Sequence, residues 1–265
     1  VEMNKINSQS GQSMTEFIIV FPIMIVLVFG ALQFALIYHA KITLNYAAFT
    51  AARSGAVSSG HLGIMENNLA VGLAPIYTHC DEDEEVGKAR DRVLKEIELG
   101  FAMIEIINPP SSAFADFNPK TNSANNAYIP NNNLMFREPT VGSSSGLSIQ
   151  DANLLKIRAS YCYPMHVPVI NTLIKTLLLN KPNDCDDVYL GLQGTDTKFT
   201  EGCIGDFESM PFENGCLIND RMPIHSTAIL RMQSDAKEDA MNSGRYPGPA
   251  PAGTELTKAE KKTTC

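Results

Sequence analysis

Residues 17–40 read FIIVFPIMIVLVFGALQFALIYHA and contain no Asp, Glu, Lys or Arg. As an α-helix this segment extends about 36 Å, whereas the hydrocarbon core of a bilayer is about 30 Å thick. A soluble helix of this length normally has a polar face, which this segment lacks. The sequence therefore predicts a single transmembrane helix over residues 17–40.

The rest of the chain has the composition of a folded protein. The whole chain has 265 residues, of which 44% are hydrophobic and 19% charged, and a formal net charge of -8. The charged fraction is too low for a disordered acidic protein or a coiled coil, and the acidic balance disfavours a nucleic-acid-binding protein. Residues 167–179 are apolar but too short and too amphipathic for a second span. We therefore expect one anchor, with most of the chain beyond it.

The sequence QSGQSMTEF at residues 9–17 leads into the anchor. A cleaved secretory signal has an apolar core of about 7–15 residues, which is shorter than the segment here. Gly11 followed by Glu16 and then at once by the apolar run resembles the processing site of type IV prepilins. The resemblance implies that a membrane aspartyl protease cuts after Gly11, that Gln12 becomes the N-terminus and that Glu16 becomes the fifth mature residue. An ordinary uncleaved anchor is the alternative.

Glu16 has two compatible interpretations. Ser13-x-x-Glu16 is a capping box, which satisfies free N–H groups at a helix start, and an acid there also suits the helix dipole. The prepilin resemblance implies instead that the Glu16 carboxylate faces the free amine of a neighbouring subunit. Such a partner would offset the cost of a carboxylate at the edge of hydrocarbon. Ser13 and Glu16 are therefore expected at the helix start, with Glu16 setting subunit register.

A stripe of small residues follows the anchor at helical spacings of three and four. Its members are Ala47, Ala48, Ala51, Ala52, Gly55 and Ala56. Small residues allow backbones to approach closely. The helix is therefore expected to continue from about Ser13 to Val57 and to use this stripe for packing. The stripe's partner is either the protein's own globular domain or helices of other subunits in a filament.

Three features together resemble the TadE/TadG-like family of minor pseudopilins of the bacterial tight-adherence (Tad) pilus. These are GQSMTEF at residues 11–17, Pro22, and AARSGA at residues 51–56. Weaker likeness extends to residues 103–117, 154–164 and 223–234. Two features depart from the family: many members are shorter, and its sequences have no known pattern matching these cysteines.

The resemblance implies a non-enzymatic minor pilin or pseudopilin that acts in pilus assembly as an initiation, tip or accessory subunit. Implied partners are the prepilin peptidase, the inner-membrane assembly platform, other minor pilins, the major pilin and the lipid bilayer, with no nucleic acid. The implied location is the bacterial inner membrane, with a cytoplasmic N-terminus and a periplasmic bulk, or the extracellular pilus. Lys5 before the anchor and Lys41 and Arg53 after it slightly oppose this orientation under the positive-inside rule.

The segment beyond the anchor has the pattern of an α+β domain. Residues 154–162 alternate apolar and polar side chains, and residues 84–99 repeat apolar side chains at helical intervals. We expect a small antiparallel or mixed sheet backed by helix 84–99 and by the C-terminal half of the anchor helix. Its strands are predicted at residues 103–107, 154–162 and 226–232.

The domain organisation follows from these elements and from changes in composition. Residues 111–150 are rich in Asn, Ser, Pro and Gly, which predicts a flexible insertion. The expected parts are a prepilin-like leader at 1–11, a long helix at 12–57, a periplasmic α+β domain at 58–243 and a disordered tail at 244–265.

The six cysteines are Cys80, Cys162, Cys185, Cys203, Cys216 and Cys265. An even number beyond a membrane anchor predicts disulfides in an oxidising compartment, with reduced thiols as the alternative. Six cysteines allow about 15 pairings, so the sequence does not determine the connectivity. Our candidates are Cys203–Cys216 as a loop staple and Cys162–Cys185 as a strand-to-loop staple. Cys265 is either free or linked to another chain.

No residue pattern points to chemistry. The sequence has no Cys-x2-Cys pair for zinc, and the acidic run at 81–85 lacks the spaced ligands of an EF-hand loop. The five histidines are scattered. We therefore expect no metal site, no cofactor and no catalytic residues. Two other functions remain open: an uncleaved membrane-anchored adhesin or scaffold, and a membrane-tethered periplasmic enzyme.

Overall fold

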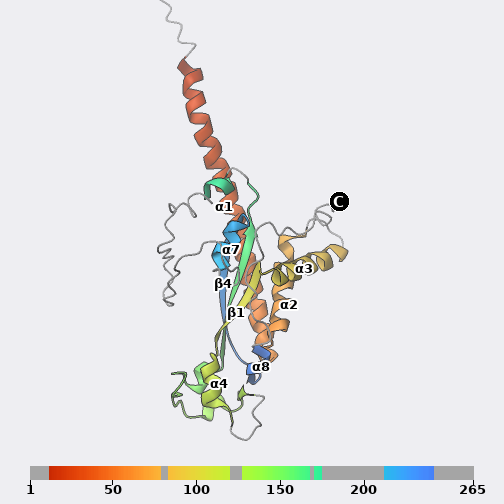
Figure 1. Ribbon diagram of the computed structural model, residues 1–265, viewed down its shortest axis with the longest axis vertical. Helices are drawn as coiled ribbons and strands as arrows, with labels where there is room; N and C mark the ends of the chain where they lie inside the picture. The colour runs from red at the N-terminus through yellow and green to blue at the C-terminus, as the bar shows by residue number, and fades with distance from the viewer. Residues whose placement is uncertain (1–11, 79–82, 120–126, 168–169, 175–211, 242–265) are drawn as a thin grey trace, which may run out of the picture.

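The computed structural model of the protein describes residues 12–78, 83–119, 127–167, 170–174 and 212–241. The fold is α+β, as predicted, with one long N-terminal helix, further helices and a small antiparallel sheet. The N-terminal half of α1 (Gln12–Val57) projects away from the other elements, which gather along its C-terminal half (Figure 1). The predicted leader 1–11 and tail 244–265 lie outside the described residues.

The helix α1 runs without interruption for 46 residues, close to the predicted helix, and contains Pro22. It ends in a tight turn in which Ser59 and Gly60 have φ values of 60° and 77°. A Cβ on Gly60 would lie 2.1 Å from Met241 Cε, so both the backbone conformation and the space require glycine. This turn leads into α2 (Leu62–Leu73), which packs back along α1.

The three predicted strands form one antiparallel sheet in the order β1-β3-β4. They are β1 (Ala102–Asn108), β3 (Leu154–Pro164) and β4 (Arg221–Arg231). β4 begins at Arg221, before the predicted start at Ser226, and pairs with β3 along its whole length. The strand includes Pro223, which an edge strand tolerates where the missing N–H faces away from the sheet.

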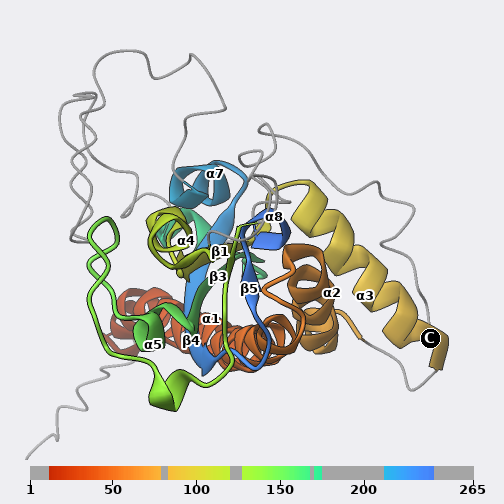
Figure 2. The ribbon, with the colours of Figure 1, turned by 90° about the horizontal axis from the view of Figure 1, so that it is seen from below.

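Helices cover one face of this sheet. Alternate β3 side chains, among them Leu155, Ile157 and Tyr161, are fully buried there, and the C-terminal half of α1 contacts both β3 and β4. α2 packs on α1, and α3 (Asp83–Glu98) packs on α2 (Figure 2). The predicted helix 84–99 is therefore present, but it lies in an outer layer and reaches the sheet mainly at β1 because α2 lies inside it.

The predicted flexible insertion 111–150 contains ordered elements in its described parts. These are α4 (Ser111–Phe117), β2 (Tyr128–Ile129), η2 (Leu134–Phe136) and α5 (Ile149–Ala152). β2 pairs with β5 (Ala236–Lys237), and the remaining short elements are η1 (Ala74–Ile76) and α8 (Glu238–Met241). α4 lies at the end of the molecule opposite the projecting half of α1 (Figure 1).

Asp116 connects α4 to the serine-rich loop that suggested flexibility. Its carboxylate accepts hydrogen bonds from the Ser145 hydroxyl at 2.7 Å and from the backbone N–H groups of Ser145 and Ser144 at 2.7 and 3.1 Å. These bonds, that of the Ser145 hydroxyl first, lower the pKa of Asp116 to about 2. These hydrogen bonds hold the serine-rich loop to α4, a contact between distant segments that composition does not reveal.

Candidate functional site

The N-terminal half of α1 has no packing partner within the described chain. Its large apolar side chains are exposed from Met14 to Leu32, and Phe17 and Leu27 are 61% and 67% exposed. Among the described residues, α1 is the one helix long and apolar enough to cross a membrane. A bilayer supplies the apolar surroundings that these side chains lack in the chain itself. This half of α1 therefore fits a membrane anchor.

Gln33 marks the place where the domain begins to cover α1. Its side chain is fully buried although it lies within the predicted span 17–40. Gln33 Oε1 accepts a hydrogen bond from the backbone N–H of Val167 at 3.0 Å, and Ile170 nearby in the chain is also buried. The last part of the predicted span thus contacts the protein's own domain on one side, and exposure on all sides of the helix ends near Leu32.

The predicted small-residue stripe lies in the C-terminal half of α1 and is buried against the protein's own domain. All six members are buried: Ala47, Ala48, Ala51, Ala52, Gly55 and Ala56. A Cβ on Gly72 of α2 would lie 2.6 Å from Ala47 Cα, and one on Gly55 would lie 2.4 Å from Met65 Sδ. Of the two partners left open by the sequence, the structure therefore has the stripe packing within the chain, where larger side chains would not fit.

An exposed apolar ridge runs along this half of α1 beside the small-residue stripe. Its members are Phe34, Tyr38, Ile42, Tyr46 and Phe49. Each is between 48% and 68% exposed, and the spacing of four and then three aligns them along the helix. Sequence reasoning missed this ridge because it followed the small residues, although the aromatic spacing was visible. An apolar surface of this extent is typical of an interaction site.

The structure describes only part of the predicted processing site. Gly11 is outside the described residues, and α1 begins at Gln12. The side chains of Gln12 and Ser13 are also outside the description, so cleavage and capping stay predictions. Glu16 follows in α1 with an exposed side chain.

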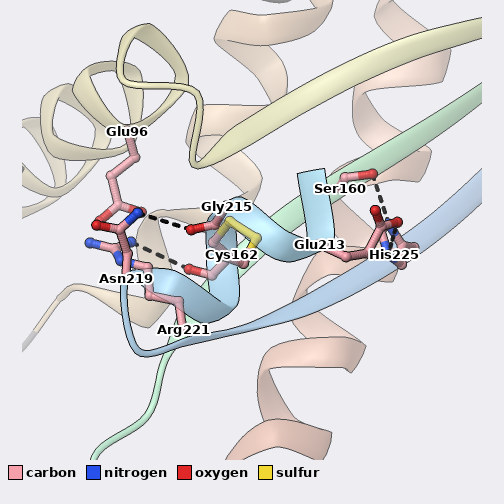
Figure 3. The surroundings of a disulfide bond; sticks show 9 residues. Glu96, Ser160, Cys162, Glu213, Gly215, Asn219, Arg221 and His225 are labelled. Carbon is pink, nitrogen blue, oxygen red and sulfur yellow. Dashed lines mark hydrogen bonds and ion pairs between the residues drawn. A yellow bond between two sulfur atoms is a disulfide. The ribbon is translucent and has the colours of Figure 1, made fainter. Parts of the chain in front are cut away.

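A disulfide joins Cys162 of β3 to Cys216 of α7 (Phe212–Ile218), with Cα atoms 5.2 Å apart (Figure 3). This finding corrects the candidate pairs Cys162–Cys185 and Cys203–Cys216, because each cysteine forms one disulfide. Cys185 and Cys203 lie outside the described residues, as does Cys265. Proximity in sequence favoured the wrong partners, whereas the fold places α7 against β3 and β4.

A buried polar cluster that the sequence did not reveal lies beside this disulfide. The hydroxyls of Tyr77 and Tyr161 are hydrogen-bonded to each other, and burial raises the pKa of both, so both stay neutral. Arg221 Nη1 lies 3.2 Å from Glu96 Oε1 and donates to the Cys162 carbonyl oxygen at 3.3 Å (Figure 3). Burial alone would lower the pKa of Arg221, but the Glu96 carboxylate raises it overall. The cluster fixes the start of β4 against α3.

Two adjoining depressions lie elsewhere, in a groove between α1 and the outer edge of β4. Tyr38, Lys41 and His225 are the titratable groups that line it. His225 Nδ1 lies 2.9 Å from Ser160 Oγ, and its Nε2 lies 3.4 Å from Glu213 Oε1 (Figure 3). Among the described residues, no three His, Cys, Asp or Glu side chains converge as metal ligands would. The groove has the character of a binding surface.

A sequence model of the family described as TadE-like protein matches residues 11–53. The match confirms the predicted family resemblance over a segment that consists almost entirely of α1, and it associates the chain with the Tad pilus. No curated protein and no solved structure matches the chain. The family match therefore concerns the anchor helix and leaves the α+β domain to be interpreted from its own geometry.

Proposed function

We propose that this chain, whose residues 11–53 are TadE-like, is a minor pilin-like subunit that acts in assembly of a Tad pilus. In this role it initiates the filament, forms part of its tip or accompanies it as an accessory component. Its partners are the prepilin peptidase, the inner-membrane assembly platform, other minor pilins, the major pilin and the bilayer.

One observation carries the proposal. The family match falls on a helix whose N-terminal half is exposed and whose C-terminal half is covered by its own domain. From Gln12 to Gln33 the helix is about 33 Å long at 1.5 Å per residue, enough to cross a hydrocarbon core of about 30 Å. Because the domain first covers the helix at Gln33, that residue would lie near the outer membrane–water boundary. A pilin-like subunit needs such a rod, fixed to a folded domain at one end and free to leave the bilayer at the other.

The proposed topology places the N-terminus in the cytoplasm and the α+β domain in the periplasm. The Cys162–Cys216 disulfide supports an oxidising compartment for the domain, since structural disulfides persist there and are rare in the cytoplasm. Peptidase cleavage after Gly11 would then leave Gln12 as the first residue, directly at the start of α1. Glu16 would reach the free amine of a neighbouring subunit and set the register between them.

The alternatives make different predictions about the mature chain. An uncleaved adhesin or scaffold keeps the residues before Gln12. A tethered enzyme needs an open pocket with converging polar groups, whereas the Tyr77–Glu96–Arg221 cluster is buried and does not line the groove. The pilin-like role explains the exposed N-terminal half of α1 and requires no catalytic centre.

The decisive experiment is mass spectrometry of the N-terminus of the protein purified from cells that assemble the pilus. We expect a chain that begins at Gln12. Glu16→Ala should abolish pilus production or reduce it at least about tenfold, which corresponds to losing one charge-assisted contact. Glu16→Asp, which keeps the charge, is the matched control and should retain more pili. A chain retaining residues before Gln12, or full piliation of Glu16→Ala, would contradict the proposal.

A further inference from the structure

Among the residues that the structure describes, no strand pairs with the outer edge of β4. The backbone N–H of Met232 donates to the Asn153 carbonyl oxygen at 2.8 Å, which continues the β3–β4 ladder and assigns the inward hydrogen bonds to even-numbered residues of β4. Odd-numbered residues therefore direct their backbone groups away from β3. Pro223 fits this parity, because its missing N–H costs the ladder nothing. The outward residues that retain both backbone groups and line the groove are His225, Thr227 and Ile229.

Lys41 of α1 already occupies one position at this edge. Its Nζ donates a hydrogen bond to the outward carbonyl oxygen of His225. This is the bond that the N–H of a neighbouring strand would make. The backbone groups of Thr227 and Ile229 have no hydrogen-bond partner in the described structure. Within the described structure, this edge therefore accepts one hydrogen bond from Lys41 at His225, and the outward backbone groups of Thr227 and Ile229 are unpaired.

A groove of about 510 Å³ runs along this edge, with α1 as its second wall. Lys41, Asn45 and Phe49 project from successive turns of α1 toward it, and residues 225–229 of β4 form the other side. A second depression of similar size adjoins it at Phe34, Tyr38 and Ile224. Phe49 and Ile229 are 48% and 59% exposed. The groove thus offers free backbone groups on one side and exposed apolar side chains on both.

We propose that this groove binds an extended, largely apolar segment of a different pilus subunit, which adds to the sheet as a strand beside β4. Recognition by strand addition combines backbone hydrogen bonds with pockets for alternate side chains, and the groove supplies both. When the strand binds, its N–H replaces Lys41 at the His225 carbonyl oxygen and frees the Lys41 ammonium. That the two subunits meet in one membrane rests on the proposed function.

The charge and direction of the groove specify its occupant further. No Asp or Glu lines either depression, although the chain as a whole carries a net charge of -8. The occupant therefore carries an Asp or Glu near the end where it releases Lys41. A second copy does not fit, because a two-fold pair of β4 edges would be antiparallel. Two copies anchored in one membrane have β4 strands that run in the same direction.

The test uses the full-length protein in cells that assemble the pilus, with the photocrosslinker p-benzoylphenylalanine in place of Ile229. We expect a crosslink whose mapped peptide lies in an extended segment of another membrane-anchored subunit, next to an Asp or Glu. The same crosslinker in place of Ile64, which is exposed on α2 away from the groove, is the control and should not give this product.

Backbone variants then test the strand itself. Thr227→Pro removes an outward N–H without removing a β3–β4 bond, and we expect it to lower the crosslink yield about tenfold. Thr227→Val keeps the N–H and should leave the yield unchanged. Formation of the Cys162–Cys216 disulfide reports correct folding of each variant. Lys41→Glu places a like charge beside the occupant's acid and should lower the yield at least about fivefold, whereas Lys41→Arg should not.

Each other outcome overturns the proposal. These outcomes are no product specific to position 229, a product with a second copy or with a helix, or a yield insensitive to Thr227→Pro or, if that variant does not fold, to Lys41→Glu. The N-terminal mass separates this failure from that of the proposed function. A chain that begins at Gln12 but gives no such crosslink refutes the strand-binding groove alone.

Discussion

The two halves of α1 are one continuous helix, yet their sequences suit different surroundings. The N-terminal half has large apolar side chains on all sides and exposes them from Met14 to Leu32. The C-terminal half has small residues toward its own domain, with the exposed apolar ridge beside them. Large side chains all round suit a solvent of lipid or neighbouring helices, whereas alanines suit a fixed protein partner at short range. The change at Gln33 therefore separates a half that fits a membrane anchor from a half that packs on the protein's own domain.

The largest expected effect comes from the disulfide that holds α7 to β3 in the domain that covers the C-terminal half of α1. Cys162 and Cys216 are 54 residues apart, and a closed loop of that length stabilises a fold by about 4 kcal/mol through the unfolded state. Cys162→Ala/Cys216→Ala should lower the free energy of unfolding of the domain by about that amount, measured by pulse proteolysis in urea on the full-length protein. Membrane insertion should be unchanged, since the variant leaves the apolar N-terminal half of α1 as it is. Equal stability of variant and parent would show that the rest of the fold holds α7 without help.

A matched pair of leucines tests the comparison directly. Leu44 is fully buried in the C-terminal half of α1, whereas Leu27 is 67% exposed in the N-terminal half. Leu44→Ala should cost the domain about 3 kcal/mol, as large-to-small core substitutions do. Leu27→Ala should change domain stability by less than about 0.5 kcal/mol. Both are measured by the same urea proteolysis. A comparable loss for Leu27→Ala would mean that the N-terminal half of α1 also contributes to the stability of the domain.

Two glycines of α2 test how closely the helices pack. A Cβ at Gly72 would meet Ala47 Cα at 2.6 Å, whereas one at Gly63 has no neighbour closer than 3.6 Å. Gly72→Ala should cost about 1–2 kcal/mol, because overpacking outweighs the better helix propensity of alanine. Gly63→Ala, the matched control, should be neutral or stabilise by up to about 1 kcal/mol. Equal effects at both positions would refute the close approach of α1 and α2.

Sequence reasoning succeeded where one local pattern decides the structure. The uncharged run at 17–40, the small-residue stripe and the alternation in 154–162 led to α1 and the sheet, and the helix termini came out within a residue of prediction. It failed where distant segments meet. The Cys162–Cys216 pair depends on how α7 crosses β3, and the bonds of Asp116 depend on a loop that composition describes as flexible. Neither can be found from spacing alone.

The candidate site shows the same division. The match at residues 11–53 was foreseeable from Gly11, Glu16 and the stripe, because those residues lie on one continuous stretch of the chain that forms a single helix and the residue before it. The groove was not, since it joins Lys41 to the edge of β4 about two-thirds of the chain later. Its one sequence signal is Pro223, which marks β4 as an edge strand. Edge position is a property of the sheet, so it became visible only with the fold.

The smallest expected effect is a pH dependence of stability where the C-terminal half of α1 meets β4. Burial lowers the pKa of His225, and the charged groups around it act in both directions: Glu213 and Glu105 raise the pKa, whereas Arg158 and Lys41 lower it. The unfolded chain therefore binds the proton more tightly than the folded one. The stability that neutral His225 contributes is fully present above the unfolded pKa of about 6.5 and is lost as the pH falls through the lower folded value.

Unfolding of the full-length protein between about pH 7 and 5 measures this contribution. His225→Gln should remove part of the decline in stability toward low pH, whereas His61→Gln, at an exposed histidine of the α1–α2 turn, should leave the decline as it is. If both variants behave alike, His225 does not titrate against the fold. If the decline steepens when a partner strand is bound, the same histidine also reports on the groove, because its carbonyl oxygen would exchange Lys41 for the strand's N–H.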